Sequence, residues 1–362
     1  MRLNVGNIYI LCRNNDSYMK VLIPEWHINK SRSSKYRTQH KPLTNYCDLH
    51  VLYGGEETEI DWCKIHGVSN FYPSWNQKLE NLVEVANHLG TLLGDFDILY
   101  TRNGGGSRML FDHLLGRACN AKTVMKLGGF GSESIQHYKT EGNMKQTNWR
   151  MQFEGVVYRM YDYIHPLSGN YVDRMDTSGV NFTDVLPLGV DKNTEIGVDL
   201  GEVVFGYAGR HAPEKATQFL GDVVGKSDVS FKSVGVYEAP FYPPKTWNYH
   251  GVLQHEEMSN FYNMISVGVL PSYTEVCPNF ILECYMHGRP VVVSENALPP
   301  EIPLFGWKVD GYEVRDWVET FKQVENPYQL GLEAQQYMME NWDSWDNYSE
   351  KLVNIFNKVL ES

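Results

Sequence analysis

Two glutamates eight positions apart, Glu275 and Glu283, lie in the segment of this sequence best suited to binding a ligand. The segment from Leu270 to Ser294 predicts a buried strand, a loop, a helix and a second buried strand. Pro278 suits the first turn of that helix, and Gly288 suits its left-handed C-terminal cap. The helix therefore begins just after Glu275, which places both carboxylates within reach of one elongated ligand.

The start of this helix is also suited to a phosphate. Its first backbone N–H groups, those of Asn279 and Phe280 among them, have no acceptor within the helix, and the helix dipole is positive there. The spacing of the glutamates alone carries little weight, since roughly one or two such pairs arise by chance in a Glu-rich chain of this length. The position of Glu275 at the end of a strand favours a binding site over a solvated carboxylate.

A pair of cations follows another predicted strand. Arg210 and Lys215 come after Val203–Ala208 and Gly209. Cations that follow a strand in this way could bind an anionic ligand. Arg offers a bidentate fork and Lys a point charge, and the alternative is an ordinary surface pair.

Strands and helices alternate along the chain, which indicates an α/β protein with parallel sheets covered by helices. A chain of 362 residues exceeds the size of one core, so we expect two Rossmann-like domains. The first spans residues 1–189 and is completed by a C-terminal amphipathic helix within 342–362, and the second spans 190–341. In such domains ligands bind at the carboxyl ends of the strands. The expected strands are 21–24, 50–53, 97–101, 123–127, 163–166, 203–208, 231–236, 267–271 and 290–293. The expected helices include 77–93, 108–119 and 344–359, and the part of the chain from Glu301 onward is expected to carry helices.

Bulk properties exclude several classes of function. The net charge of −12 disfavours nucleic acid as a partner, and no apolar run approaches the roughly 20 residues of a spanning helix. The six cysteines show no metal-site spacing, which favours reduced thiols and a cytoplasmic location. The basic stretch Lys30–Lys41 is either a solvated loop or a site for an anionic membrane surface or a phosphorylated acceptor.

The first half offers weaker candidates. Gly104, Gly105 and Gly106 follow Arg102 and precede a helix, so they form either a structural turn or a contact to a phosphate or acceptor. His165, before Pro166, is either catalytic or a structural histidine. Asp95 and Asp97 more simply open a strand than bind a metal, and we expect no metal site.

Residues Tyr249–Ser294 resemble the donor-binding half of the retaining GT-B glycosyltransferases, in the large family that includes glycogen synthase-like and lipopolysaccharide-type enzymes (glycosyltransferase family 4-like). The segment Phe205–Lys215 resembles the Gly-Arg…Lys phosphate clamp of that family, with Ala216 where many relatives have Gly. Lys126 stands in the first half where relatives often carry a His-Gly pair, and the usual active-site histidine has no obvious counterpart. The matched residues are Pro271-Ser272, Glu275, Cys277-Pro278-Asn279, Glu283, Gly288-Arg-Pro-Val-Val and, in the preceding helix, His255–Tyr262.

The resemblance implies a role for each matched residue. Glu283 would hold the ribose hydroxyls of a nucleotide, Glu275 the hydroxyls of the transferred sugar, and Arg210 with Lys215 the departing diphosphate. The lining of the sugar and phosphates would come from Gly209, Cys277, Pro278, Asn279 and Phe280.

The implied fold is GT-B, two Rossmann-like domains facing each other across a cleft. The implied activity is transfer of a sugar, with retained configuration and without a metal, from a nucleotide sugar such as a UDP- or GDP-sugar to a glycan or lipid-linked acceptor. A nucleotide-sugar epimerase, a phosphorylase with pyridoxal phosphate and a non-catalytic nucleotide-sugar-binding protein are the alternatives on the same fold, and DNA glycosylation is a further one.

Overall fold

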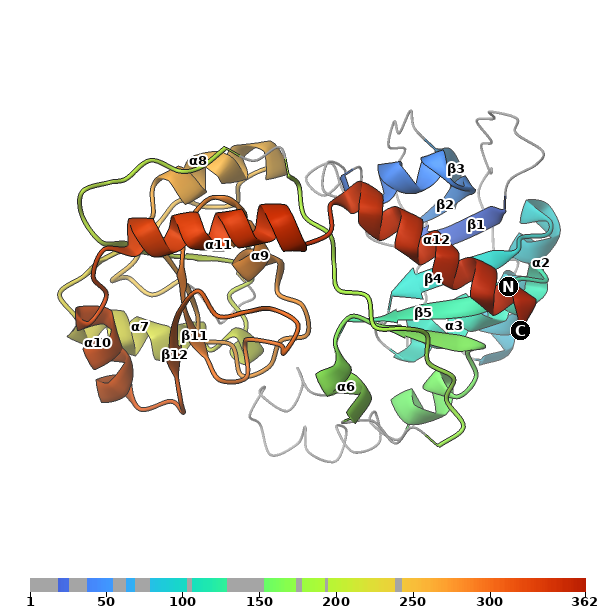
Figure 1. Ribbon diagram of the computed structural model, residues 1–362. Helices are drawn as coiled ribbons and strands as arrows, with labels where there is room; N and C mark the ends of the chain where they lie inside the picture. The colour runs from blue at the N-terminus through green and yellow to red at the C-terminus, as the bar shows by residue number, and fades with distance from the viewer. Residues whose placement is uncertain are drawn as a thin grey trace. The chain divides into compact units, whose positions relative to one another are not determined.

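The computed structural model describes residues 19–25, 38–54, 63–68, 79–102, 106–128, 153–173, 178–192, 195–237 and 243–362. The chain divides into two compact units, and each has its own six-stranded sheet (Figure 1). Unit 1 comprises Met1–Ser132, Met144–Leu186 and Trp345–Ser362, and unit 2 comprises Glu133–Asn143 and Pro187–Ser344.

The sheet of unit 1 is parallel throughout, in the order β3-β2-β1-β4-β5-β6. Its strands are β1 (Lys20–Glu25), β2 (Asp48–Gly54), β3 (Lys64–Val68), β4 (Ile98–Arg102), β5 (Lys122–Leu127) and β6 (Tyr163–Pro166). Val21 of β1 pairs with both Leu49 and Ile98, so β1 and β4 are neighbours in space although two strands separate them in sequence. The winding therefore reverses between β1 and β4, as in doubly wound nucleotide-binding domains.

Helices cover both faces of this sheet. Leu99 of β4 packs in one hydrophobic cluster with residues of α2 (Leu79–Leu93) and α3 (Gly106–Ala118). The next residue, Tyr100, points to the opposite face, where its ring lies 5.1 Å from that of Phe356 in α12 (Trp345–Glu361). The buried stripe of α12 confirms the predicted amphipathic helix that returns to the N-terminal part of the chain (Figure 1). The shorter elements are η1 (Lys41–Asn45) and α6 (Gly169–Asp173).

The sheet of unit 2 is also parallel, in the order β12-β11-β10-β7-β8-β9. Its strands are β7 (Val204–Ala208), β8 (Ser230–Val234), β9 (Asn248–Tyr249), β10 (Val267–Leu270), β11 (Val291–Ser294) and β12 (Gly306–Val309). The winding again reverses once, here between β7 and β10. Both units thus have the strand order of a Rossmann-like domain, and their switch points lie at β1/β4 and β7/β10.

The helices of unit 2 form two layers. α8 (Met258–Asn263), α9 (Asn279–Met286) and α11 (Pro327–Asn341) lie over one face, and α7 (Thr217–Lys226) and α10 (Val314–Lys322) lie over the other (Figure 1). Phe205 of β7 stacks on Phe321 of α10 at 4.3 Å, whereas its neighbour Gly206 leaves room for Ile265 beside α8. Two 3₁₀ turns, η2 (Pro213–Lys215) and η3 (His255–Glu257), complete this unit.

Each strand expected from the sequence is present, with ends within two residues of those predicted. The helices expected from Glu301 onward are present as α10, α11 and α12, but the edge strand β12 at Gly306–Val309, which precedes them, was not predicted. Gly306 permits this pairing, since it has a φ of 148° and a side chain there would meet the carbonyl of Val291. β3 and β9 were not predicted. Within the described ranges, none of the helices is long and apolar enough to cross a membrane.

Candidate functional site

Two segments that are distant in sequence meet at the carboxyl ends of β7 and β10, the switch point of unit 2. The Nζ of Lys215, in the turn that follows β7, donates to Oε1 of Glu275 at 2.6 Å across 60 residues of sequence. The hydroxyl of Ser272, just after β10, donates to the same oxygen at 2.7 Å. The structure therefore brings together Lys215 and Glu275, two residues for which the sequence predicts binding roles.

The second cation has a buried partner. Arg210 forms an ion pair with Glu214, whose side chain is only 3% exposed while that of Arg210 is 39% exposed. The hydroxyl of Tyr207 donates to the backbone carbonyl of Arg210 at 2.6 Å. Burial raises the pKa of Tyr207 well above its usual value, and the negative charge of Glu275 raises it further. Tyr207 therefore stays protonated between the two segments and fixes the backbone that carries Arg210.

Close backbone packing fixes the loop that carries these cations. A side chain at Gly209 would lie 2.8 Å from the hydroxyl oxygen of Tyr207, so only glycine fits there. Ala216, which ends the turn after Lys215, adopts a left-handed conformation with φ 50° and ψ 30°. Glycine adopts this conformation at less cost than alanine, so Ala216 carries a local backbone cost that a glycine would not.

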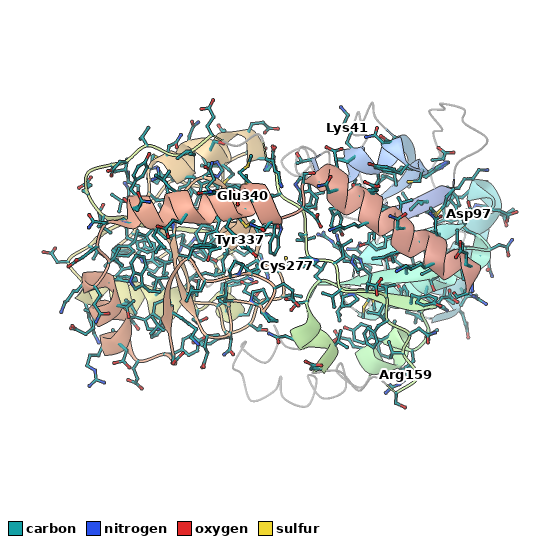
Figure 2. The ribbon with its side chains drawn as sticks, in the orientation of Figure 1. Lys41, Asp97, Arg159, Cys277, Tyr337 and Glu340 are labelled. Carbon is teal, nitrogen blue, oxygen red and sulfur yellow. The ribbon has the colours of Figure 1, made fainter. Side chains whose placement is uncertain are left out.

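The helix that follows Glu275 begins as predicted. Pro278 is its N-cap, one residue earlier than expected, and α9 starts at Asn279. Within the described part of the chain, the backbone N–H groups of Asn279 and Phe280 donate no hydrogen bond, so they and the positive end of the helix dipole are available to an anion. Cys277, labelled in Figure 2, lies in the loop that leads into this helix. Gly288 has a φ of +67°, which confirms the predicted left-handed cap.

In Glu275 and in Glu283, one carboxylate oxygen accepts hydrogen bonds from described residues and the other accepts none. Oε2 of Glu283 accepts a hydrogen bond from the hydroxyl of Tyr262 at 2.6 Å. Oε1 of Glu275 accepts from both Lys215 and Ser272. No described residue donates to Oε1 of Glu283 or to Oε2 of Glu275. Since a carboxylate only accepts hydrogen bonds, each remaining oxygen suits the hydroxyl groups of a ligand.

The candidates of unit 1 have other environments. His165 is fully buried, and its Nδ1 lies 2.8 Å from the hydroxyl of Tyr100. Burial and, to a lesser extent, the positive charge of Lys126 lower the pKa of His165 to about 3, which keeps the ring neutral as in a structural histidine. Lys126 lies over the ring of Tyr100, 5.8 Å from its centroid, and Arg102 is the half-buried last residue of β4.

Several predicted sites lie partly outside the described residues. Gly106 is the first residue of α3, and Gly104 and Gly105 lie outside the described ranges. Of the basic stretch Lys30–Lys41, only residues 38–41 are described. Among the residues that the structure describes, no three His, Cys, Asp or Glu side chains come together as a metal site would require.

Three residues of unit 2 were not assigned roles from the sequence. Glu214 stands four positions after Arg210, a spacing that favours an ion pair in a helical turn and could have indicated it. Tyr262 could not have been predicted as a partner of Glu283, because 21 residues separate them. His211 is fully buried, and its ring centroid lies 5.4 Å from that of Tyr207 and 5.5 Å from that of Trp247. Both of its ring nitrogens lack a hydrogen-bond partner among the described residues.

Comparisons with known proteins bear on unit 2 and on the fold. The family described as "Glycosyl transferases group 1" matches residues 202–325. No curated protein sequence matches the chain significantly. Among solved structures, sucrose-phosphate synthase from Thermosynechococcus elongatus is similar with a TM-score of 0.75 and 12% identity, over 95% of this chain and 99% of that one.

Two further solved structures carry nucleotide ligands. The catalytic domain of starch synthase IV from Arabidopsis thaliana, bound to ADP and acarbose, has a TM-score of 0.67 and 10% identity over 95% of this chain and 100% of that one. A trehalose-6-phosphate protein from E. coli, bound with UDP-2-fluoro glucose, has a TM-score of 0.65 and 10% identity over 94% and 99%. These likenesses, all at low identity, show a GT-B fold of two Rossmann-like domains. The match over residues 202–325 shows that the second unit carries a group 1 glycosyltransferase segment, and the activity of the whole chain is taken up below as a proposal.

Proposed function

We propose that this protein is a retaining glycosyltransferase that moves a sugar from a nucleotide-sugar donor to a hydroxyl acceptor without a metal. The observation that carries the proposal is the junction at the switch point of unit 2. There a lysine and a glutamate from two separate segments are joined at 2.6 Å, beside Arg210 and the start of α9. Cations, a helix N-terminus and free carboxylate oxygens at one sheet edge match the parts of a nucleotide sugar.

Each group of the donor has a counterpart in this site. Arg210 and Lys215 would bind the diphosphate, together with the N–H groups of Asn279 and Phe280. Glu275 would bind the hydroxyls of the transferred sugar through its remaining oxygen, and Glu283 the ribose hydroxyls of the nucleotide. Glu214 keeps the guanidinium of Arg210 oriented before the ligand arrives.

The protein contributes charge stabilisation and positioning in this mechanism. The bond between the anomeric carbon and the leaving phosphate oxygen breaks, and the sugar becomes oxocarbenium-like. The acceptor oxygen attacks from the same face, and its proton passes to the leaving phosphate oxygen. Arg210 and Lys215 stabilise the charge that grows on the diphosphate, so their contribution is larger in the transition state than in the bound donor.

Ligand screening tests the donor, and product analysis tests the stereochemistry. Thermal shifts are measured with UDP-, GDP- and ADP-sugars in EDTA; a donor at 100 times its Kd raises stability by about 2.7 kcal/mol. The anomeric configuration of the product is then read by NMR, with glycan and lipid-linked acceptors as substrates. We expect one donor to bind in EDTA and the configuration to be retained. An inverted product, or turnover abolished by EDTA and restored by a divalent cation, would refute the proposed chemistry.

The acceptor is the least constrained part of the proposal. The stretch Lys30–Lys41 offers positive charge for a membrane-bound or phosphorylated acceptor, on the order of 1 kcal/mol per residue at an acidic surface. Sedimentation with vesicles of anionic and of neutral lipid, using the whole protein, tests this association with a membrane surface. Equal binding to both kinds of vesicle, or to neither, would remove it.

A further inference from the structure

Among the described residues, Tyr262 is the one whose side chain donates a hydrogen bond to the carboxylate of Glu283. It lies in α8, is fully buried, and its hydroxyl reaches Oε2 of Glu283 in α9 at 2.6 Å. The hydroxyl is held as a donor, because burial and then the charge of Glu283 raise the pKa of Tyr262 well above its usual value. A carboxylate offers no proton of its own, so the direction of this bond is fixed.

The ring of Tyr262 is fixed by its neighbours. His287 stacks on it with 4.3 Å between ring centroids, and Nδ1 of His287 donates to the backbone carbonyl of Glu283 at 2.8 Å. Arg289, whose side chain is almost completely buried, donates through Nε to the backbone carbonyl of Tyr262 at 3.0 Å. The second arm of Arg289 donates to the carbonyl of Val198 at 2.9 Å, beside Gly197, where a side chain would collide with the guanidinium. Tyr262 is therefore a rigid donor.

The two glutamates of the site differ in the charge of their partners. Glu275 is paired with a cation, Lys215, whereas the side-chain partner of Glu283 is a neutral hydroxyl. No described Lys, Arg or His forms an ion pair with Glu283. Its charge thus stays uncompensated while its orientation is fixed, and a charged acceptor forms stronger hydrogen bonds with hydroxyl groups than a neutral one.

We propose that Tyr262 is a positioning residue, which holds Oε2 of Glu283 so that Oε1 accepts hydrogen bonds from the ribose hydroxyls of the donor nucleotide. This inference rests on the proposed function, which assigns Glu283 to the ribose. Tyr262 itself does not touch the ligand. Its role is to occupy one carboxylate oxygen of Glu283 and so fix the orientation of the other, as residues around binding groups commonly do.

Nucleotides with and without ribose hydroxyls test this role. The Kd of the whole protein is measured for UDP, GDP and ADP and for their 2′,3′-dideoxy counterparts, and the nucleotide that binds tightest is used further. In Tyr262→Phe we expect affinity for the ribonucleotide to fall roughly 10-fold, the scale of one hydrogen bond to a charged group, with the dideoxynucleotide unchanged. A merely structural defect would weaken both nucleotides equally, so the ratio of the two Kd values reports the role.

Tyr285→Phe is the matched control. Tyr285 is also fully buried on α9, but its hydroxyl bonds to the backbone of Pro303 and Phe305 and not to Glu283. We expect this variant to keep the wild-type ratio. Glu283→Asp is the second variant, because it keeps the charge but shortens the reach to Tyr262. Like Tyr262→Phe, it should bind the ribonucleotide and the dideoxynucleotide with more nearly equal Kd values than the wild type does.

The outcomes separate this inference from the function on which it rests. Wild-type protein that binds none of the nucleotides, or binds the ribo and dideoxy forms equally, overturns the assignment of Glu283 and the inference with it. Wild-type protein that discriminates, with Tyr262→Phe discriminating equally well, overturns the positioning role alone. Loss of discrimination in Tyr262→Phe and Glu283→Asp but not in Tyr285→Phe supports it.

Discussion

Replacing Arg210 separates the proposed catalytic contribution of this residue from its contribution to stability. Arg210→Ala removes a cation from the diphosphate site, and loss of one preorganised charge-stabilising donor costs about 10²- to 10³-fold in turnover. It also leaves the buried carboxylate of Glu214 without its ion-pair partner. Breaking a fully buried pair costs about 3–5 kcal/mol. Since the Arg210 side chain is 39% exposed, solvent screening reduces this to about 1–3 kcal/mol.

The double variant Arg210→Ala/Glu214→Gln distinguishes the two effects. Glutamine carries no charge, so the desolvation cost of an unpaired carboxylate disappears, and most of the lost stability should return. Turnover should not return, because no cation has been restored. At about 2–4 °C per kcal/mol for a domain of 150–250 residues, the stability change is readable in a melting curve.

The assay combines Tm with single-turnover rates at saturating donor for wild type, both single variants and the double variant. Glu214→Gln alone serves as the control, since it keeps the cation and should retain much of the turnover. If turnover recovers together with Tm in the double variant, Arg210 acts by folding the loop and not by stabilising the leaving group. Unchanged turnover in Arg210→Ala would remove its assignment altogether.

Three further substitutions, at Ala216, Gly288 and His211, test local features of unit 2, and a fourth, at Ala118 of unit 1, is a control. Ala216→Gly should raise stability by up to about 1 kcal/mol, because it relieves a left-handed alanine at φ 50°. Ala118→Gly at the end of α3 should lower stability instead. The midpoints of denaturant unfolding of the two variants are compared with that of the wild type. Gly288→Ala should cost about 1–2 kcal/mol for the opposite reason, since it places a side chain at φ +67°, and an unchanged midpoint would contradict this. Burial lowers the pKa of His211 from 6.5 to about 4, so between these pH values the unfolded chain binds a proton that the folded protein does not. The free energy of unfolding should therefore fall as pH drops from about 6.5 towards 4. Denaturation measured at pH 7 and at pH 5 should show a smaller fall in His211→Leu than in the wild type. An equal fall in the two proteins would contradict this prediction.

The sequence was informative where structure is set by short segments. Apolar runs of four to six residues predicted strands such as β7 and β10, since buried parallel strands are continuously hydrophobic. β9, with two residues, and β12, with four, have too little pattern to be predicted. Their pairing depends on a neighbouring strand that is already in place, so it follows from the tertiary fold.

The same limit applies to the candidate site. The start of α9 follows from adjacent residues, with Pro278 before it and Gly288 after it, and it was predicted to within one residue. The partners of the functional groups are far away in sequence, as the bond between Tyr262 and Glu283 shows. Burial is likewise invisible in one sequence, and this is why His165 could be weighed as catalytic although its ring is completely enclosed.

The geometry of unit 2 also couples two parts of the proposed donor site. Lys215 bonds to Glu275, so the cation proposed for the diphosphate and the carboxylate proposed for the sugar neutralise each other. A diphosphate that attracts Lys215 weakens this bond and leaves Glu275 a stronger acceptor for sugar hydroxyls. Ser272 keeps the carboxylate in place meanwhile, because its hydroxyl donates to the same oxygen. Glu283, held by an uncharged tyrosine, has no such exchange of partners, which suits a group that holds one end of the donor while the reaction proceeds at the other.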